Sequence, residues 1–504
     1  MRFSCRSHDG PKLGRREFFA GLAATSAMAC GCLTVSGCAV NPATGRNNLM
    51  GLSSINDDIR TGSRAYPEVI ASLGGAYGND RLASYITSLG RKIAATSELP
   101  DLPYEFTVIN AQNINAFALP GGKIGVTRGL LALASNEAEV AGVLAHEIGH
   151  ANARHSAQSR SRAGLANFGL AILGAATGSS ALVDLGQSVA GTFLQSYSRE
   201  QEFEADSLAV RYLARTRYDP SAMATMLASM REEEQISAAM RGLPAGTTDQ
   251  FNIMASHPRT VERVREAMAA AGGAPIENPT VGRSEYLQAI NGLLFADDPD
   301  QGLVRGRKFV HAGLRFSFEV PEGFRISNQS QNVVAKGPGD TTIVFDMAPV
   351  TRARNLVEYL QYEWVRDIPL QGLESLRVNG IAAATGAARI EDGQREIDLR
   401  AVAYDGGQGR VFRFLFLAIP QTTRALSGAL RETTYSFRRI DDAEARETKP
   451  LRIIIADVRA GDTVDALARS LPFGKYNSDW FRVLNDMPPG QEVRVGQTVK
   501  IVTA

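Results

Sequence analysis

The sequence predicts a multidomain protein: a mainly α-helical domain with a small β-sheet, then an α+β domain and a small βααβ module. Three observations predict this division. The chain has 504 residues, 44% hydrophobic and 21% charged, which is ordinary globular material but too long for one compact core. Helical spacing dominates the first half, and alternating strands mixed with helices dominate the second. Breaks in composition at residues 271–275 and 297–300 separate these parts.

Charge excludes one class of partner. Lys and Arg number 54 and Asp and Glu number 53, so the net charge is close to zero. The sequence has no basic block of the kind that follows nucleic-acid phosphates. We therefore expect no nucleic-acid partner.

The first 37 residues have the pattern of an export signal. Residues 15–19 (Arg-Arg-Glu-Phe-Phe) precede an apolar, Ala-rich stretch, as in a twin-arginine-like signal peptide. This stretch ends in residues 35–38 (Val-Ser-Gly-Cys), which resemble the lipobox of a bacterial lipoprotein and predict lipidation of Cys38. All four cysteines lie in residues 5–38, so the mature chain is expected to contain no disulfide.

The rest of the chain is predicted to be anchored to a membrane rather than to span it. A spanning helix needs roughly 18 to 20 apolar residues, and the nearest stretch, residues 164–178, is shorter and contains Asn167. The expected location is the periplasm of a Gram-negative bacterium. Ala39, which follows the lipobox cysteine, favours the outer membrane.

Helices and strands of the first domain follow in order. Residues 56–97 carry helical spacing. Residues 104–109 alternate like a strand, and the Leu-Pro-Gly-Gly turn at 119–122 precedes a second apolar run at 124–127, which predicts a hairpin-like unit. A long apolar helix is predicted over residues 137–156.

Two local signals define the helices that carry the chemistry. Asn136 and Glu139 have the spacing of a capping box at the start of the long helix. A Gly/Ala/Ser-rich stretch at residues 163–191 separates that helix from a second one predicted over residues 199–215.

The long helix contains a metal-binding motif. His146 and His150 lie four residues apart, so both imidazoles face one side of the helix and can bind a single zinc ion. Glu147 between them is placed to act as the general base on a water molecule during hydrolysis. We expect one Zn²⁺ per chain.

The third ligand must come from elsewhere. A metzincin would have its third His at position 156, which is Ser156, and His155 falls on the far side of a continuous helix at about 100° per residue. A gluzincin takes a Glu from a later helix. In that case Glu202 would be the ligand, and Asp206, one turn later, is expected to accept the outer N–H of a ligand His.

These motifs together resemble the M48 peptidases, which include CAAX prenyl proteases, HtpX proteases, mitochondrial proteases of the Oma type and soluble BepA-like lipoproteins. The resemblance covers about residues 40–270 and rests on residues 146–155, 198–206 and 115–122. It implies a zinc peptidase domain over residues 38–300 with Glu202 as third ligand. It also implies a substrate cleft bordered by Asn115, Ala116 and Phe117.

His257, followed by Pro258 and Arg263, also resembles a family element. Zinc in a catalytic site keeps one open position. We expect His257 to act as a gate or fourth ligand that keeps the enzyme latent. The alternative is a histidine that simply packs near a turn.

Two further regions complete the chain. Residues 318–324 (Phe-Glu-Val-Pro-Glu-Gly-Phe) resemble PsbP-like folds, which predicts an α+β domain over 301–445 without indicating a function. Residues 446–504, with Gly-Asp-Thr at 461–463, look like a LysM-type module, which implies binding to N-acetylglucosamine polymers such as peptidoglycan.

The sequence therefore predicts a zinc-dependent metalloendopeptidase that hydrolyses cell-envelope proteins, with unfolded or misassembled proteins as substrates. Two alternatives stay open. The first is a non-enzymatic or latent envelope chaperone or peptidoglycan-binding lipoprotein. The second is an enzyme that cuts peptidoglycan peptides. Glu147 argues against the first, because a structural zinc site needs ligands but no base.

Overall fold

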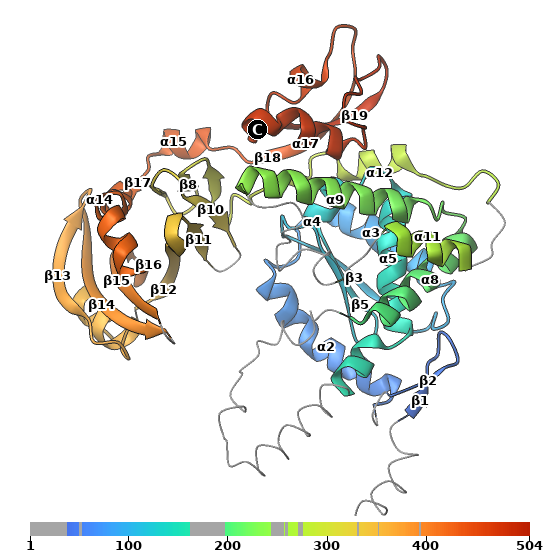
Figure 1. Ribbon diagram of the computed structural model, residues 1–504, viewed down its shortest axis with the longest axis horizontal. Coiled ribbons are helices and arrows are strands. Elements are labelled where there is room, and N and C mark those ends of the chain that lie inside the picture. The colour runs from blue at the N-terminus through green and yellow to red at the C-terminus, as the bar shows by residue number, and fades with distance from the viewer. Residues whose placement is uncertain are drawn as a thin grey trace, which may run out of the picture.

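The computed structural model describes residues 38–49, 53–161, 197–242, 257, 261–270, 276–329, 332–350, 352–392 and 395–504. They form a helical body, a β-rich body beside it and a small module above α9 (Figure 1). The predicted multidomain architecture of helices with several sheets is confirmed at this level. The expected signal peptide, the apolar stretch 164–178 and the Gly/Ala/Ser-rich residues 163–191 lie outside the described residues. Within the described part of the chain, no helix is both long and apolar enough to cross a membrane.

The helical body surrounds one buried helix, α5, which contains the metal-binding motif. Nearly every residue of α5 is buried, including its polar ones, and the helix contacts α3, α8, α9 and β4. The elements of this body are β1 (Cys38–Val40), β2 (Asn47–Leu49), α2 (Ile55–Ser72), α3 (Asp80–Ala94), β3 (Glu105–Ile109), β4 (Ala116–Leu119), β5 (Lys123–Thr127), α4 (Arg128–Leu133), α5 (Glu137–Asn152), α8 (Arg199–Thr216), α9 (Ala222–Arg241), α11 (Val261–Ala270) and α12 (Arg283–Ile290).

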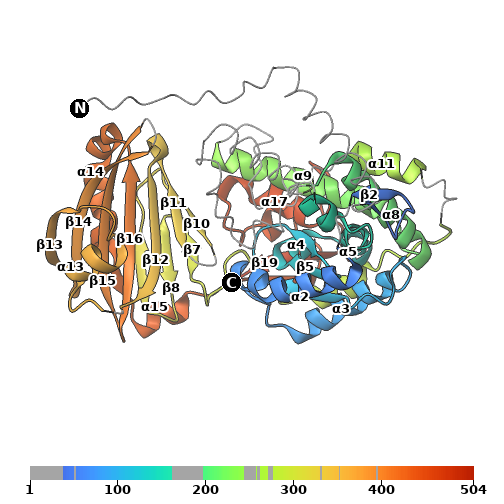
Figure 2. The same ribbon diagram turned by 90° about the horizontal axis from the view of Figure 1, so that it is seen from below.

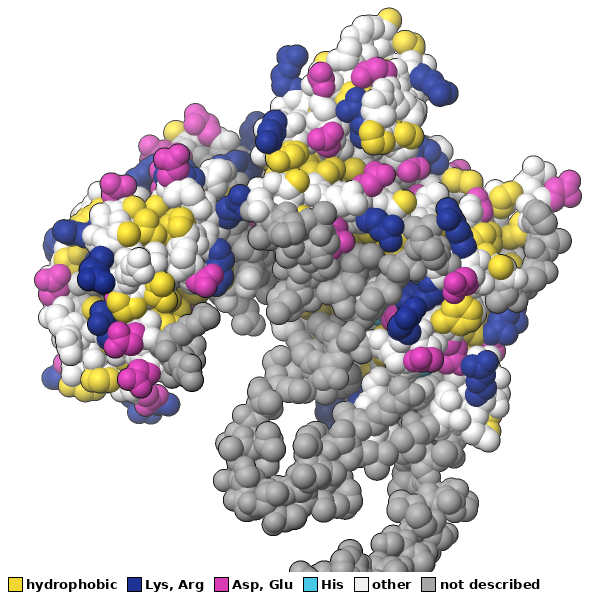
Figure 3. Space-filling model, in the orientation of Figure 1, with side chains coloured by type: hydrophobic (Ala, Val, Ile, Leu, Met, Phe, Trp, Pro, Cys, Tyr) yellow, Lys and Arg dark blue, Asp and Glu magenta, His cyan; other side chains and the backbone are white. Residues whose placement is uncertain are grey.

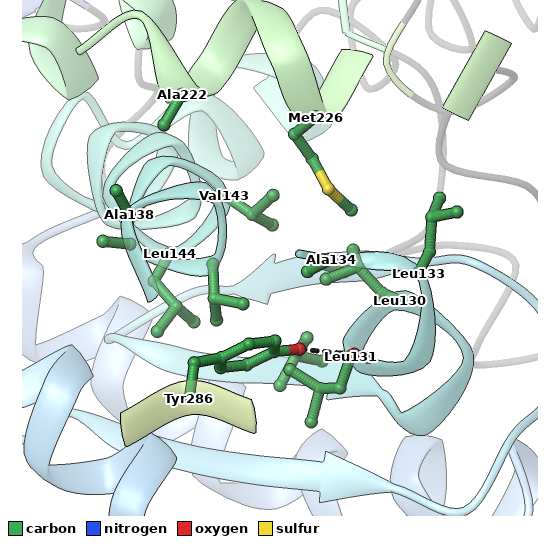
Figure 4. Close-up of a cluster of buried hydrophobic side chains, with 14 of the residues drawn as sticks. Leu130, Leu131, Leu133, Ala134, Ala138, Val143, Leu144, Ala222, Met226 and Tyr286 are labelled. Atoms are coloured by element: carbon green, nitrogen blue, oxygen red, sulfur yellow. Dashed lines mark hydrogen bonds between the residues drawn. The ribbon is translucent and has the colours of Figure 1, made fainter. Parts of the chain in front are cut away.

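The core around α5 holds the helix rigidly. Val143 and Leu144 of α5 pack between Met226 of α9 and Tyr286 of α12 (Figure 4). The hydroxyl of Tyr286 donates a hydrogen bond to the carbonyl oxygen of Leu131. Full burial of a leucine side chain contributes about 1.5–3 kcal/mol, so the position of α5 is strongly fixed.

The small sheet differs from the predicted hairpin of 104–109 with 124–127. β5 pairs in parallel with β3 and antiparallel with β4, so the hairpin is β4–β5. The prediction was wrong because the residues directly before the Pro-Gly-Gly turn form a strand of their own. Gly121 and Gly122 have φ of +75° and +80°, which glycine adopts without strain.

The β-rich body contains a seven-stranded antiparallel sheet, in the order β10-β11-β12-β16-β15-β14-β13, and a four-stranded sheet, β17-β9-β8-β7. Figure 2 shows the long strands side by side, and α14 packs against β9, β15 and β16. Phe316, Phe345 and Phe412 form part of its own aromatic core. Its elements are β7 (Leu303–Arg305), β8 (Lys308–His311), β9 (Phe316–Glu319), β10 (Arg325–Asn328), β11 (Val333–Lys336), β12 (Thr342–Pro349), α13 (Leu356–Glu358), β13 (Gln371–Val378), β14 (Ile381–Asp392), β15 (Arg395–Gly407), β16 (Arg410–Ala418), α14 (Pro420–Ser436), β17 (Arg438–Arg439) and α15 (Asp442–Glu447).

The C-terminal module follows the order β-α-α-β: β18 (Leu451–Asp457), α16 (Val464–Leu467), α17 (Asn477–Leu484) and β19 (Thr498–Thr503). β18 pairs with β19 on one side and with β6 (Leu294–Phe295), from the end of the helical body, on the other. Acidic and basic side chains are interspersed over the module and the β-rich body on the face in Figure 3.

Candidate metal centre

The start of α5 is fixed by side-chain caps. The Asn136 side chain accepts the backbone N–H of Glu139 at 3.0 Å, as the sequence pattern predicts. The Glu139 carboxylate accepts the backbone N–H of Ser135 at 2.7 Å instead of that of Asn136. The capping pair therefore forms, but the backbone N–H that donates to Glu139 is that of Ser135, one residue before Asn136.

Helix α8 approaches α5 closely because α5 has a glycine at the crossing. A Cβ atom on Gly149 would lie 3.1 Å from the carbonyl oxygen of Ala205. At its start, α8 is capped reciprocally by Ser198 and Gln201. Glu202, in the first turn of α8, is thus brought beside the two histidines of α5.

Four buried side chains converge on one point. The Nε2 atoms of His146 and His150 lie 2.9 Å apart, and the Glu202 carboxylate oxygens lie 3.6 Å and 3.4 Å from them. His257 joins the group with its Nδ1 atom 2.8 Å from Glu202 Oε1. One ligand atom from each of the four side chains lies within 4.8 Å of every other.

These residues fit a zinc ion. Zinc prefers imidazole nitrogen and carboxylate oxygen in a tetrahedral set, and ligand imidazoles must be neutral. Burial, together with the neighbouring His146, lowers the pKa of His150 well below its ordinary value. Burial alone raises the pKa of Glu202, but the charge and the hydrogen bond of His257 hold it well below the ordinary range.

A second group of charges supports the ligands. Asp206 Oδ1 lies 2.8 Å from His146 Nδ1, the ring nitrogen that faces away from the cluster. Arg263 of α11 donates to Asp206 at 2.7 Å and to Glu202 at 3.1 Å. This arginine balances two carboxylates that are otherwise buried together.

Glu147 is fully buried beside the cluster, and its Oε1 atom lies 3.9 Å from His257 Nε2. It follows His146 directly on α5, so its carboxylate is held by the same rigid helix. A carboxylate in this place can exchange a proton with a group bound at the cluster.

The structure places His155 differently from the expected far side of the helix. Its Nδ1 atom lies 2.8 Å from Nδ1 of His150, and its Nε2 atom lies 3.0 Å from Glu204. The extrapolation at about 100° per residue fails because α5 ends at Asn152 and Arg154 has a left-handed φ of 55°. The chain turns there, and His155 faces the site.

The remaining predicted site residues lie outside the cluster. Asn115, Ala116 and Phe117 are buried in and beside β4, an edge strand of the small sheet. Among the described residues, the Asn115 Oδ1 atom has no hydrogen-bond partner. Cys38 begins β1, and its side chain lies outside the description.

Sequence reasoning missed three contributors. His155 was placed on the wrong face, Glu204 belongs to an acidic run that is typical of solvated helix surfaces, and Arg263 was noted only as part of a resemblance. The signal for His155 was the Ala-Arg-His segment behind the motif. Its meaning depends on the end of α5, which periodicity does not reveal.

Known proteins are similar to the part of the chain that carries the cluster. Residues 80–271 match the model of peptidase family M48. The "Beta-barrel assembly-enhancing protease" of Escherichia coli is 30% identical over 195 residues, 37% of this chain and 38% of that protein. "Mitochondrial metalloendopeptidase OMA1" of Arabidopsis thaliana is 40% identical over 134 residues, 26% of this chain and 27% of that protein. The chain therefore matches well under half the length of either relative.

A solved structure shows only weak similarity to this chain. The solution structure of cyanobacterial PsbP (CyanoP) from Synechocystis sp. PCC 6803 aligns with 26% of this chain and 91% of its own, at 14% identity and a TM-score of 0.23. A similarity of this size supports no inference about fold, so the PsbP-like prediction for residues 301–445 stays a prediction.

Proposed function

We propose that this chain, whose residues 80–271 match peptidase family M48, is a zinc metalloendopeptidase that hydrolyses proteins of the cell envelope. One observation carries the proposal: two imidazoles and a carboxylate converge in a buried cluster directly beside the buried carboxylate of Glu147. His146, His150 and Glu202 are the proposed ligands.

The proposed roles follow from position. Zinc, when bound, polarises the scissile carbonyl and makes water a stronger nucleophile at neutral pH. Glu147 accepts the proton of the attacking water and passes it to the leaving amine. Asp206 orients His146 through its outer ring nitrogen, and Arg263 holds Asp206 and Glu202 in place.

The proposed location is the periplasm. A lipid on Cys38 anchors the chain to a membrane in this proposal, and the outer membrane is the favoured one. The name of the E. coli relative supports substrates among envelope proteins, and unfolded or misassembled ones are proposed here. Peptidoglycan binding through residues 446–504 is part of the same proposal. The β-α-α-β order of this module supports it.

His257 is proposed to keep the enzyme latent. It shares the ligand cluster and lies 2.8 Å from Glu202, so it competes for the position that a substrate carbonyl or water needs. Its removal is expected to open that position.

The test is cleavage of casein by residues 39–504, with bound zinc quantified, in wild type, Glu147→Gln, His257→Ala and the control Glu285→Gln. Glu285 is exposed on α12. We expect Glu147→Gln to keep zinc and lose cleavage at least about 100-fold, and His257→Ala to cleave faster than wild type.

Other outcomes distinguish the alternatives. Bound zinc without cleavage by wild type or by His257→Ala would favour the non-enzymatic chaperone. Cleavage of peptides in purified cell wall, with casein left intact, would favour the peptidoglycan enzyme. Slower cleavage by His257→Ala would contradict gating.

A further inference from the structure

A chain of hydrogen bonds leads from the N-terminal hairpin to a zinc ligand. The Asn41 side-chain amide donates to Glu204 Oε1 at 2.9 Å. The other oxygen of Glu204 lies 3.0 Å from His155 Nε2, and His155 Nδ1 lies 2.8 Å from Nδ1 of His150. Asn41 and His155 are fully buried and the Glu204 side chain is 12% exposed, so water has little access to these bonds.

The chemistry of the groups fixes the direction of each bond. A carboxylate only accepts, so Asn41 and His155 both donate to Glu204. With its proton on Nε2, His155 has a lone pair on Nδ1, which accepts the Nδ1–H of His150. The Nε2 lone pair of His150 is then directed at His146 and Glu202, where the metal would bind.

The position of Asn41, at the hairpin end of this series of hydrogen bonds, is also fixed by its contacts. The Asn41 Oδ1 atom accepts the backbone N–H of Ala43 at 2.9 Å, which leaves the amide nitrogen to face Glu204. Arg211 of α8 donates to the carbonyl oxygen of Ala43 at 3.4 Å. Strands β1 and β2 have three residues each, too few to be stable alone. The hairpin therefore owes its place to these contacts with α8.

The two ligand histidines are supported in different ways. His146 contacts a carboxylate, Asp206, directly, whereas His150 reaches its carboxylate only through a second histidine. The arrangement at His150 also includes Asn41, which lies about 100 positions before α5 in the sequence. If Asn41 merely filled space, its amide would not need to face Glu204.

We propose that Asn41, Glu204 and His155 form a positioning relay through which the N-terminal hairpin holds His150 in its metal-binding tautomer and orientation. The inference rests on the zinc site of the proposed function. It concerns binding of the metal, whereas the proposed function concerns what the loaded site does.

The experiment measures zinc affinity of residues 39–504 by competition with a chromophoric chelator, and the visible spectrum of the Co²⁺-loaded protein. The variants are His155→Leu, His155→Gln, Asn41→Ala and the hairpin control Asn47→Ala, whose side chain is exposed. Thermal unfolding of each variant in excess zinc checks that it folds.

We expect His155→Leu and Asn41→Ala to weaken zinc binding about 10- to 100-fold and to alter the Co²⁺ spectrum. His155→Gln should keep most of the affinity, because an amide can accept from His150 and donate to Glu204. Asn47→Ala should match wild type. If His155→Leu fails to fold, Asn41→Ala and His155→Gln still decide the question.

Wild-type zinc affinity and an unchanged Co²⁺ spectrum in Asn41→Ala would overturn the relay. Equal losses in Asn41→Ala and Asn47→Ala would also overturn it, since they would indicate a general effect on the hairpin. Failure of the proposed function looks different: the wild type would bind zinc and cleave no protein, while the order of zinc affinities could still follow the relay.

Discussion

The C-terminal module and the β-rich body are attached to the helical body in opposite ways. Buried side chains of the module, such as Ile453 and Phe481, belong to the same hydrophobic cluster as Leu144 of α5. The β-rich body has separate cores and contacts the helical body through polar groups, among them Asn328 with Asp297 at 3.2 Å. Breaks in composition therefore do not show which segments fold together, whereas continuity of the core does.

Strand pairing explains the difference. β6, at the end of the helical body, pairs with β18, and the β-rich body lies between them in sequence. The two ends of this insertion lie close together. The Arg305 side chain at one end donates a hydrogen bond to the carbonyl oxygen of Lys449 at the other, at 2.7 Å. The β-rich body is thus inserted into a unit formed by the helical body and the module.

The largest effect is expected from truncation after residue 445. Removal of the module would expose the part of the shared core that it covers, including Phe295, which contacts Phe473 and Trp480. We expect the truncated chain to lose cooperative unfolding in urea, followed by circular dichroism. Cooperative unfolding at the wild-type midpoint would show that the core is not shared energetically.

An intermediate effect is expected from Lys500→Met. The Lys500 ammonium donates to the carbonyl oxygens of Ala132, Leu133 and Ala134 at 2.8–2.9 Å, at the end of α4. The substitution leaves these buried acceptors without their donor, at a cost of about 3 kcal/mol in the free energy of unfolding. Urea unfolding measures this change, and Lys475→Met, at an exposed lysine of the same module, serves as control. Equal stability of the two variants would contradict the prediction.

The smallest effect is expected from excision of residues 306–448 and their replacement by a short Gly/Ser linker. Because the ends of the insertion already meet, the linker has little distance to span, and loop closure costs little free energy. We expect zinc affinity within about threefold of wild type and a cooperative thermal transition. A collapse of zinc binding would mean that the β-rich body supports the metal centre.

Much of the fold was predictable from local pattern. The predicted strand at 104–109 and the predicted helices at 137–156 and 199–215 appear as β3, α5 and α8, with ends shifted by a few residues, because alternation and helical spacing are strong there. Residues 355–367 of the β-rich body have helical spacing, but after α13 they continue as a π-helical segment, Tyr359–Trp364. Hydrophobic spacing does not distinguish these two kinds of helix.

Only part of the metal centre was predictable from the sequence. The motif of His146 and His150 and the pair of Glu202 and Asp206 depend on spacing within single helices, which a sequence displays directly. The contact of His155 with His150 depends on one left-handed residue, and the contact of Asn41 with Glu204 joins segments more than 160 residues apart. Such contacts depend on tertiary packing and leave no periodic signal.

The pairing of β6 with β18 also sets the order of events during synthesis. When the ribosome has synthesised the segment that contains His257, it has not yet made β18 and β19. About 150 residues separate β6 from β18. Long-range pairings of this kind form late, after the intervening chain exists. A nascent chain therefore carries the complete metal motif before it has the strand that closes the core, and we expect the metal centre to become rigid only after β18 has been made.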